Sequence, residues 1–141
     1  MDPPQDGAPA GAAAAGRRVL VVEDDEATAT VWEWALADEG YEVRTRGSAL
    51  GVAALLRDWR PDAVLLDLGL PDRSGACLLA ALKADPATAA IPVVVVSGAP
   101  WALTPAYQRL AAAVLPKPFD LEHALAVVAA LWPPPPRAHS G

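Results

Sequence analysis

Four runs of apolar residues in this chain each end in polar side chains. The acidic stretch 23–25 follows the first run, Asp67 the second, Ser97 a run of four valines, and Lys117 the last. A lone carboxylate buried beside such a run costs on the order of several kcal/mol unless another group compensates it. The repetition predicts one site built from separated segments.

The residue types in these positions suit phosphoryl transfer. Asp24 and Asp67, with Glu23 behind them, would repel one another in a partly desolvated cleft, so either a proton is retained or a cation is recruited. An oxygen-only set of this kind suits Mg²⁺. The Ser97 hydroxyl and the Lys117 ammonium match phosphoryl oxygens by hydrogen bonding and charge. Together these groups are what transfer of a phosphoryl group to an aspartate requires, with the carboxylate as the nucleophile.

Each residue also has a simpler interpretation when it is taken alone. Asp25 and Glu26 fit the acidic first turn of a helix. A serine ends many strands, so Ser97 gains meaning only from its partners, and the same holds for Lys117. His123 falls in the last helical pattern, far from the strand ends, and is expected to be a surface residue.

Short apolar runs and longer helical patterns alternate along the chain. The runs predict strands over 18–23, 41–46, 62–68, 91–97 and 112–117. The second run alternates apolar and polar residues, which is typical of a half-exposed edge strand, whereas the runs over 18–23 and 62–68 are continuously apolar, which indicates burial on both faces. Strands alternating with helices predict a three-layer α/β fold, a doubly wound five-stranded parallel sheet with its working site at the carboxyl ends of the strands.

Five helices are expected between and after these strands. The first follows the pattern over 24–40, with acidic residues in its first turn and a stop at Gly40. The others run from a Ser48 cap to the residue before Pro61, from a Ser74 cap over Gly75 to about Ala84, over about 104–112, and over 120–131. The segment between Ser97 and Lys117 is short and interrupted by prolines, so its helix is expected to be short or irregular.

Composition limits the classes of function. The net charge of −6, from 17 acidic and 11 basic residues, argues against nonspecific binding to nucleic acid. The single cysteine, Cys77, cannot form an internal disulfide and is expected to be a packing residue. No apolar stretch reaches the roughly 20 residues of a membrane span. We expect a soluble, cytoplasmic protein without a secretory signal.

The two ends differ from the middle of the chain. Residues 1–17 are rich in Ala, Pro and Gly and are expected to be disordered, and residues 133–141 form a Pro-rich disordered tail. The compact domain is predicted over 18–132. No further domain is expected after it, so the protein should act through partners.

Four motifs, in order, carry a family resemblance: "VLVVEDDE", "LLDLGLPDRSG", "VVVVSG" and "LPKPF". They span about residues 18–131, and with them the chain resembles a response-regulator receiver domain of two-component signalling, of the single-domain, chemotaxis-regulator-like kind. The resemblance implies the flavodoxin-like strand order 2-1-3-4-5. It also implies a cis peptide bond between Lys117 and Pro118.

The resemblance also implies a role for each site residue. Asp67 would accept a phosphoryl group from the phosphohistidine of a histidine kinase. Asp67 and Asp24 would ligate Mg²⁺ directly, with Glu23 acting through a metal-bound water and Gly69 through its backbone carbonyl. Ser97 would be the switch hydroxyl, and Lys117 would pair with the phosphoryl oxygens. Such a domain catalyses its own phosphorylation and slow dephosphorylation and is not otherwise an enzyme.

The partners implied are a sensor histidine kinase or phosphotransfer protein and an unknown downstream protein. Direct DNA binding is not expected, and the oligomeric state implied is a monomer or a weak phosphorylation-dependent dimer. One position departs from the family, because Val114 stands where an aromatic ring usually swings inward on activation. A valine has one stiff χ1 and no ring.

Two alternatives follow from these residues. The departure at Val114 leaves open a phosphorylation-independent interaction module that keeps the fold without the switch. A phosphatase with an aspartate nucleophile is disfavoured, because such enzymes need a second acid where this chain has Gly69.

Overall fold

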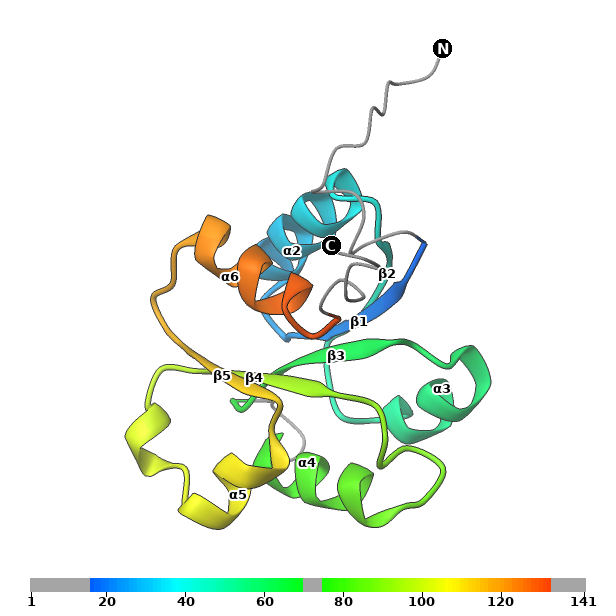
Figure 1. The fold of residues 1–141 in the computed structure, drawn as a ribbon, viewed down its shortest axis with the longest axis vertical. Helices are drawn as coiled ribbons and strands as arrows, with labels where there is room; N and C mark the ends of the chain where they lie inside the picture. The colour runs from blue at the N-terminus through cyan, green and yellow to red at the C-terminus, as the bar shows by residue number, and fades with distance from the viewer. Residues whose placement is uncertain (1–15, 70–74, 133–141) are drawn as a thin grey trace, which may run out of the picture.

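The computed structural model describes residues 16–69 and 75–132, which form one parallel sheet with helices on both faces (Figure 1). The strands lie in the order β2-β1-β3-β4-β5, all parallel. Their bounds are β1 Arg18–Val22, β2 Glu42–Arg46, β3 Ala63–Asp67, β4 Val93–Ser97 and β5 Ala113–Pro116. The predicted fold class and strand order are confirmed.

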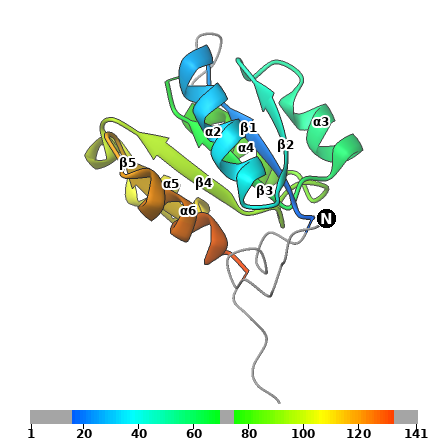
Figure 2. The same cartoon turned by 90° about the horizontal axis from the view of Figure 1, so that it is seen from above.

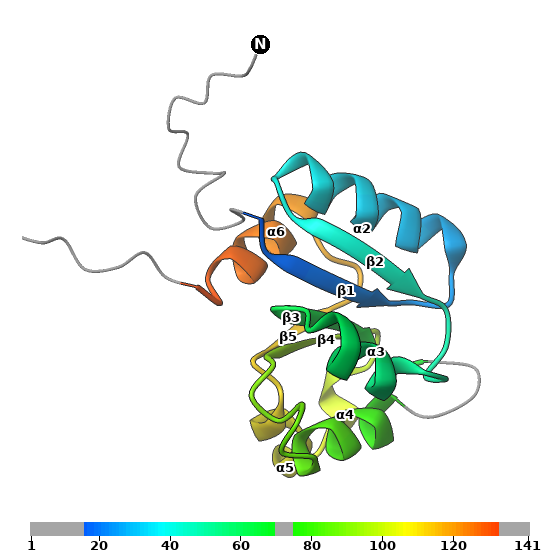
Figure 3. The ribbon, with the colours of Figure 1, turned by 90° about the vertical axis from the view of Figure 1, so that its right-hand side faces the viewer.

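The helices cover the two faces of the sheet unequally. Their bounds are α2 Glu26–Asp38, α3 Val52–Trp59, α4 Gly75–Ala84, α5 Pro105–Leu110 and α6 Leu121–Ala129, with a 3-10 turn, η1, over Pro100–Ala102. Helices α2 and α6 lie side by side on one face (Figure 2), and α3, α4 and α5 lie on the other (Figure 3). Each face has its own apolar core, so the molecule has three layers.

Burial explains why the strands form where they do. All five residues of β3 and all five of β4 are buried, as continuous apolar strands between two helix layers require. Strand β2 alternates exposed and partly buried residues and lies at one edge of the sheet. The edge position predicted from its alternating pattern is confirmed.

Helix α2 begins and ends at the expected signals. The Asp25 side chain caps its first turn by accepting a hydrogen bond from the Thr28 backbone N–H, at 3.0 Å. At the other end Gly40 has a φ of +105°, a conformation that glycine adopts without strain.

The predicted start of the second helix is wrong. Helix α3 begins at Val52, after Gly51 in the left-handed conformation, and has no side-chain cap. The Ser48 hydroxyl accepts a hydrogen bond from the Leu50 backbone N–H, at 3.3 Å. This local turn engages the hydroxyl before the helix begins. The predicted Ser74 cap lies outside the described residues.

The segment after Ser97 is irregular, as predicted. It contains η1 and then α5, which has six residues. Prolines at positions 100 and 105 begin the two short elements, where a missing backbone N–H costs least. The predicted helix over about 104–112 is therefore confirmed in a shortened form.

Two other expectations concern single side chains. Cys77 is exposed on α4, so its predicted packing role is wrong. His123 is exposed on α6, as expected. Within the described part of the chain, no helix has the length and hydrophobicity of a membrane-spanning segment.

Gly75, the first residue of α4, is required by a close approach of two backbones. A Cβ at this position would lie 2.5 Å from the Leu68 Cα and 2.8 Å from the Asp67 carbonyl oxygen. We expect Gly75→Ala to lower the free energy of unfolding by about 1–3 kcal/mol, because the backbone after β3 has to move. Urea denaturation measures this loss.

Gly98→Ala is the matched control, because a Cβ there meets no heavy atom within 4 Å beyond its own chain neighbours. A Gly75→Ala variant as stable as Gly98→Ala would contradict the packing argument.

Candidate acidic phosphoryl-acceptor site

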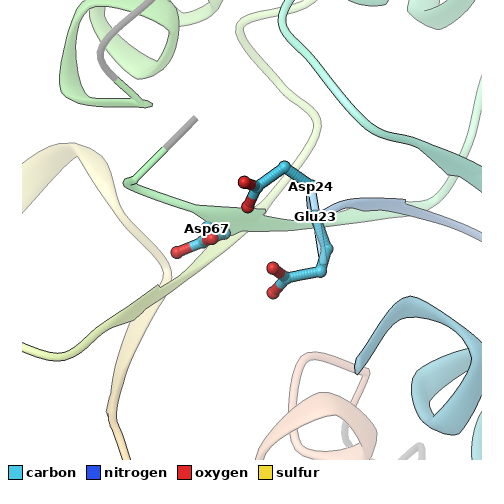
Figure 4. A group of neighbouring side chains, drawn as sticks. All are labelled: Glu23, Asp24 and Asp67. Atoms are coloured by element: carbon cyan, nitrogen blue, oxygen red, sulfur yellow. The ribbon is translucent and has the colours of Figure 1, made fainter. Parts of the chain in front are cut away.

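Three carboxylates meet at the carboxyl edge of the sheet (Figure 4). Glu23 and Asp24 follow β1, and Asp67 ends the neighbouring β3. One carboxylate oxygen from each residue lies within 4.8 Å of the others. Glu23 and Asp67 are only 5% and 7% exposed, whereas Asp24 is exposed. The sequence-based prediction that these residues come together agrees with this geometry.

Lys117 reaches the same cluster from the end of β5. Its Nζ lies 3.3 Å from Asp67 Oδ1 and 3.9 Å from Glu23 Oε1. The ammonium is about one-third exposed, at 36%, so it neutralises part of the carboxylate charge while its remaining donors stay accessible. The Lys117–Pro118 peptide bond is cis, as the resemblance implied.

Ser97 is joined to Lys117 through the backbone. The Lys117 N–H donates to the Ser97 carbonyl oxygen at 2.8 Å, which continues the pairing of β4 with β5. The Ser97 side chain is buried, and its Oγ accepts a hydrogen bond from the Ala99 N–H at 3.0 Å. The hydroxyl hydrogen therefore remains available for another acceptor.

Gly69 lies in the same cleft, two residues after the central carboxylate. Its N–H donates to Asp67 Oδ1 at 3.3 Å. Asp67 Oδ1 thus accepts from both Gly69 and Lys117, and these two bonds orient the carboxylate.

Burial sets the protonation of Glu23. The pKa of this carboxyl is raised from 4.5 to about 7. Desolvation is the largest cause of the rise and the neighbouring Asp67 charge adds to it, while the Asp25 N–H and Lys117 oppose it. Near neutral pH the cluster therefore holds either a proton on Glu23 or a compensating cation. The donors are all oxygen atoms, a set that fits Mg²⁺ rather than softer metals.

The cleft also has an apolar side that the sequence analysis did not find. A cavity of about 620 Å³ is lined at one end by Asp67, Ser97 and Lys117. Its other walls include Leu68, Ala76, Ala99 and Leu103. These residues meet only because α4 and η1 flank the same strand ends, so no local pattern marked them.

Phe119 was also missed as a supporting residue. Its ring lies 5.0 Å, centroid to centroid, from the ring of the buried Trp32 on α2. The aromatic residue in the "KPF" motif was the available signal. This contact anchors the loop after Lys117 against α2, in the helix layer that also contains α6.

Comparison with known proteins agrees with the fold and with the motif order. The family model described as "Response regulator receiver domain" matches residues 19–129. The DNA-binding transcriptional regulator NtrC of Azospirillum brasilense is 36% identical over 110 residues, which are 78% of this chain and 23% of that protein. The transcriptional regulatory protein KdpE of Staphylococcus aureus is 35% identical over 80 residues, which are 57% of this chain and 33% of that protein. The chain thus spans about a quarter to a third of these relatives.

Solved receiver domains share the architecture across their whole length. A CheY-like receiver domain from Methylobacillus flagellatus is 31% identical with a TM-score of 0.70, covering 80% of this chain and 98% of that one. The receiver domain of a Pseudomonas aeruginosa sensor histidine kinase, solved with magnesium in its active-site cleft, is 26% identical with a TM-score of 0.67. That match covers 82% of this chain and 99% of the other. The strand order, the clustered strand-end residues and the match over 19–129 show that this chain belongs to the response regulator receiver domain family.

Proposed function

We propose that this chain is a Mg²⁺-dependent phosphoacceptor of a two-component system, in which Asp67 takes a phosphoryl group from the phosphohistidine of a histidine kinase or phosphotransfer protein. One observation supports it above all others. Lys117 Nζ lies 3.3 Å from Asp67 Oδ1, inside a cluster of three carboxylates that needs further positive charge.

In the proposed reaction Asp67 is the nucleophile. One of its carboxylate oxygens bonds to phosphorus while the bond from phosphorus to the imidazole nitrogen breaks, and the leaving imidazole keeps the electron pair. The Lys117 ammonium and the Ser97 hydroxyl donate to the phosphoryl oxygens. The burial of Asp67 keeps water away from the carboxylate.

Glu23, Asp24 and Asp67, with the Gly69 carbonyl, are the residues proposed to hold Mg²⁺. The bound metal supplies positive charge that offsets the carboxylate repulsion and the charge of the phosphoryl oxygens. The chain then serves as both the catalyst and the acceptor of a single transfer, and it is not an enzyme acting on other substrates.

We place the output of this domain in protein partners. Two of the relatives are named as DNA-binding or transcriptional regulators, but this chain spans only a quarter to a third of their length. Its net charge of −6 disfavours contact with a phosphate backbone. Phosphorylation at Asp67 is proposed to change the binding of a protein, in a monomer or a weak dimer.

A phosphorylation-independent interaction module is the second candidate. Val114 lies on β5, is partly buried, and packs against the core on the α3–α5 side of the sheet. A valine fixed there has no ring that could change its position when Asp67 is modified.

Asp67→Asn tests the acceptor. We expect wild-type protein incubated with phosphoramidate and Mg²⁺ to gain the mass of one phosphoryl group, and Asp67→Asn to gain none, because an amide is not a nucleophile here. Intact-protein mass spectrometry measures the gain. Asp58→Asn, an exposed carboxylate on α3, is the control and should be labelled like wild type. Unlabelled wild type would overturn the proposal.

The two candidates differ in what modification does beyond the cleft. With beryllofluoride and Mg²⁺ as a phosphoryl mimic, a switch should shift backbone amide NMR signals in α5 and β5 as well as around Asp67. Shifts confined to the residues that line the cleft would favour the interaction module.

Glu23→Gln tests the cost of carboxylate crowding. The raised pKa of Glu23 means that the folded protein holds this proton more tightly than the unfolded chain does. Without metal, stability is therefore lost as pH rises from 4.5 to about 7, by up to about 3 kcal/mol. We expect Glu23→Gln to be more stable than wild type at pH 8 in EDTA, and the difference to vanish near pH 4.5.

Urea denaturation at the two pH values checks this expectation, and added Mg²⁺ gives a second readout. Mg²⁺ should stabilise wild type at pH 8 more than it stabilises Glu23→Gln, because the variant lacks one carboxylate. Equal stability of the two proteins at pH 8 in EDTA would contradict the assignment.

A further inference from the structure

We propose that the apolar side of the Asp67 cleft binds the acyl group of apolar acyl phosphates, so that these small molecules phosphorylate Asp67 faster than acetyl phosphate does. This inference rests on the proposed acceptor function and adds a substrate class to it. It is carried by the shape and the lining of one cavity.

The cavity joins a charged end to an apolar end. Asp67, Ser97 and Lys117 occupy the charged end, where a phosphoryl group would react. The other residues that line the cavity include Leu68, Ala76, Ala99 and Leu103. A ligand that matches both ends carries a phosphoryl group at one end and an apolar chain at the other.

Small residues keep this apolar end open. Ala76 is a partly buried residue in the first turn of α4, and Ala99 lies two residues after Ser97. Both have only a methyl side chain, so neither fills the space. The position of Ala99 is fixed, because its N–H donates to Ser97 Oγ at 3.0 Å.

Leu103 forms the opposite wall of the cavity, and its position is fixed by packing and by a backbone hydrogen bond. Leu103 is only 6% exposed and packs into the core on the α3–α5 side. Its N–H donates to the Pro100 carbonyl oxygen at 3.1 Å, which closes the η1 turn. An acyl chain lying between Ala76 and Leu103 would therefore meet a preformed apolar surface, and little ordering would be needed for it to bind.

The size of the cavity favours a donor larger than acetyl phosphate. A volume of about 620 Å³ lies within the range of small-molecule sites, about 300–1,000 Å³. Acetyl phosphate carries a single methyl group and would leave most of the apolar wall in contact with water. Each further buried methylene group is expected to raise the rate constant by about fourfold.

The reaction balances without another reactant. A carboxylate oxygen of Asp67 bonds to phosphorus, and the bond from phosphorus to the bridging acyl oxygen breaks. The acyl carboxylate leaves with the electron pair, so no proton has to be supplied. Lys117 and Ser97 donate to the phosphoryl oxygens as they would with phosphohistidine.

Butyryl phosphate and acetyl phosphate are the matched probes, because their carboxylates are nearly equal leaving groups and the donors differ by two methylene groups. The measurement is the second-order rate constant for labelling of the full chain with Mg²⁺, followed by intact-protein mass spectrometry. We expect butyryl phosphate to react about fifteenfold faster than acetyl phosphate.

Two variants connect this preference to the cavity. Ala76→Leu places a larger side chain in the apolar end and should bring the butyryl-to-acetyl ratio close to one. Ala81→Leu makes the same substitution at an exposed position of the same helix and should keep the wild-type ratio. Circular dichroism of both variants checks that they fold.

The outcomes separate this inference from the proposed function. Labelling by acetyl phosphate with a butyryl-to-acetyl ratio near one in wild type would overturn the inference and leave the acceptor function standing. A wild-type ratio that persists in Ala76→Leu would also overturn it, because the preference would then arise elsewhere. No labelling by either donor or by phosphoramidate would overturn the acceptor function itself.

Discussion

The crowding of carboxylates in a buried place is the interaction on which the rest of this structure depends. Glu23 and Asp67 are nearly inaccessible to water, yet their oxygens and one of Asp24 lie within 4.8 Å of one another. The pKa of Glu23 rises to about 7 as a result, and Lys117 offsets only part of the repulsion. Such an arrangement has an unmet need for positive charge, which a bound cation would supply.

The parallel sheet is what makes the crowding possible. Strands covered on both faces leave their carboxyl ends as the place where polar side chains from distant segments can meet. The register pairs Ser97 with Pro116, so Lys117 follows directly beside the Ser97 carbonyl. Gly75 lets α4 start against the backbone of Leu68 and Asp67. The apolar core thus holds charged groups together that would separate if they were free.

Much of this arrangement could be predicted from the sequence, because its causes are local. Continuous valine-rich runs specify buried strands, and a polar residue at the end of each run marks the working edge. The predictions failed where burial depends on contacts between segments that are far apart in the sequence. The apolar pattern of its helix predicts that Cys77 packs in the core, but in the structure Cys77 lies on a face of α4 that is exposed to solvent. The apolar side of the cleft depends on how α4 and η1 approach each other, and no single stretch encodes that approach.

Val114 lies on β5, beside the strand whose end carries Ser97. Val114 has no aromatic ring that could move when Asp67 is phosphorylated. A structural change would then have to pass from Asp67 to the surface through the hydrogen bonds at the strand ends. The Ser97 hydroxyl accepts from Ala99 and can donate to a phosphoryl oxygen, which would couple that oxygen to the segment leading into η1. Lys117 is linked through Pro118 to Phe119, whose ring packs on Trp32 in the α2–α6 layer. A phosphoryl group would then pull on both layers through backbone already in place, and an aromatic switch would not be required.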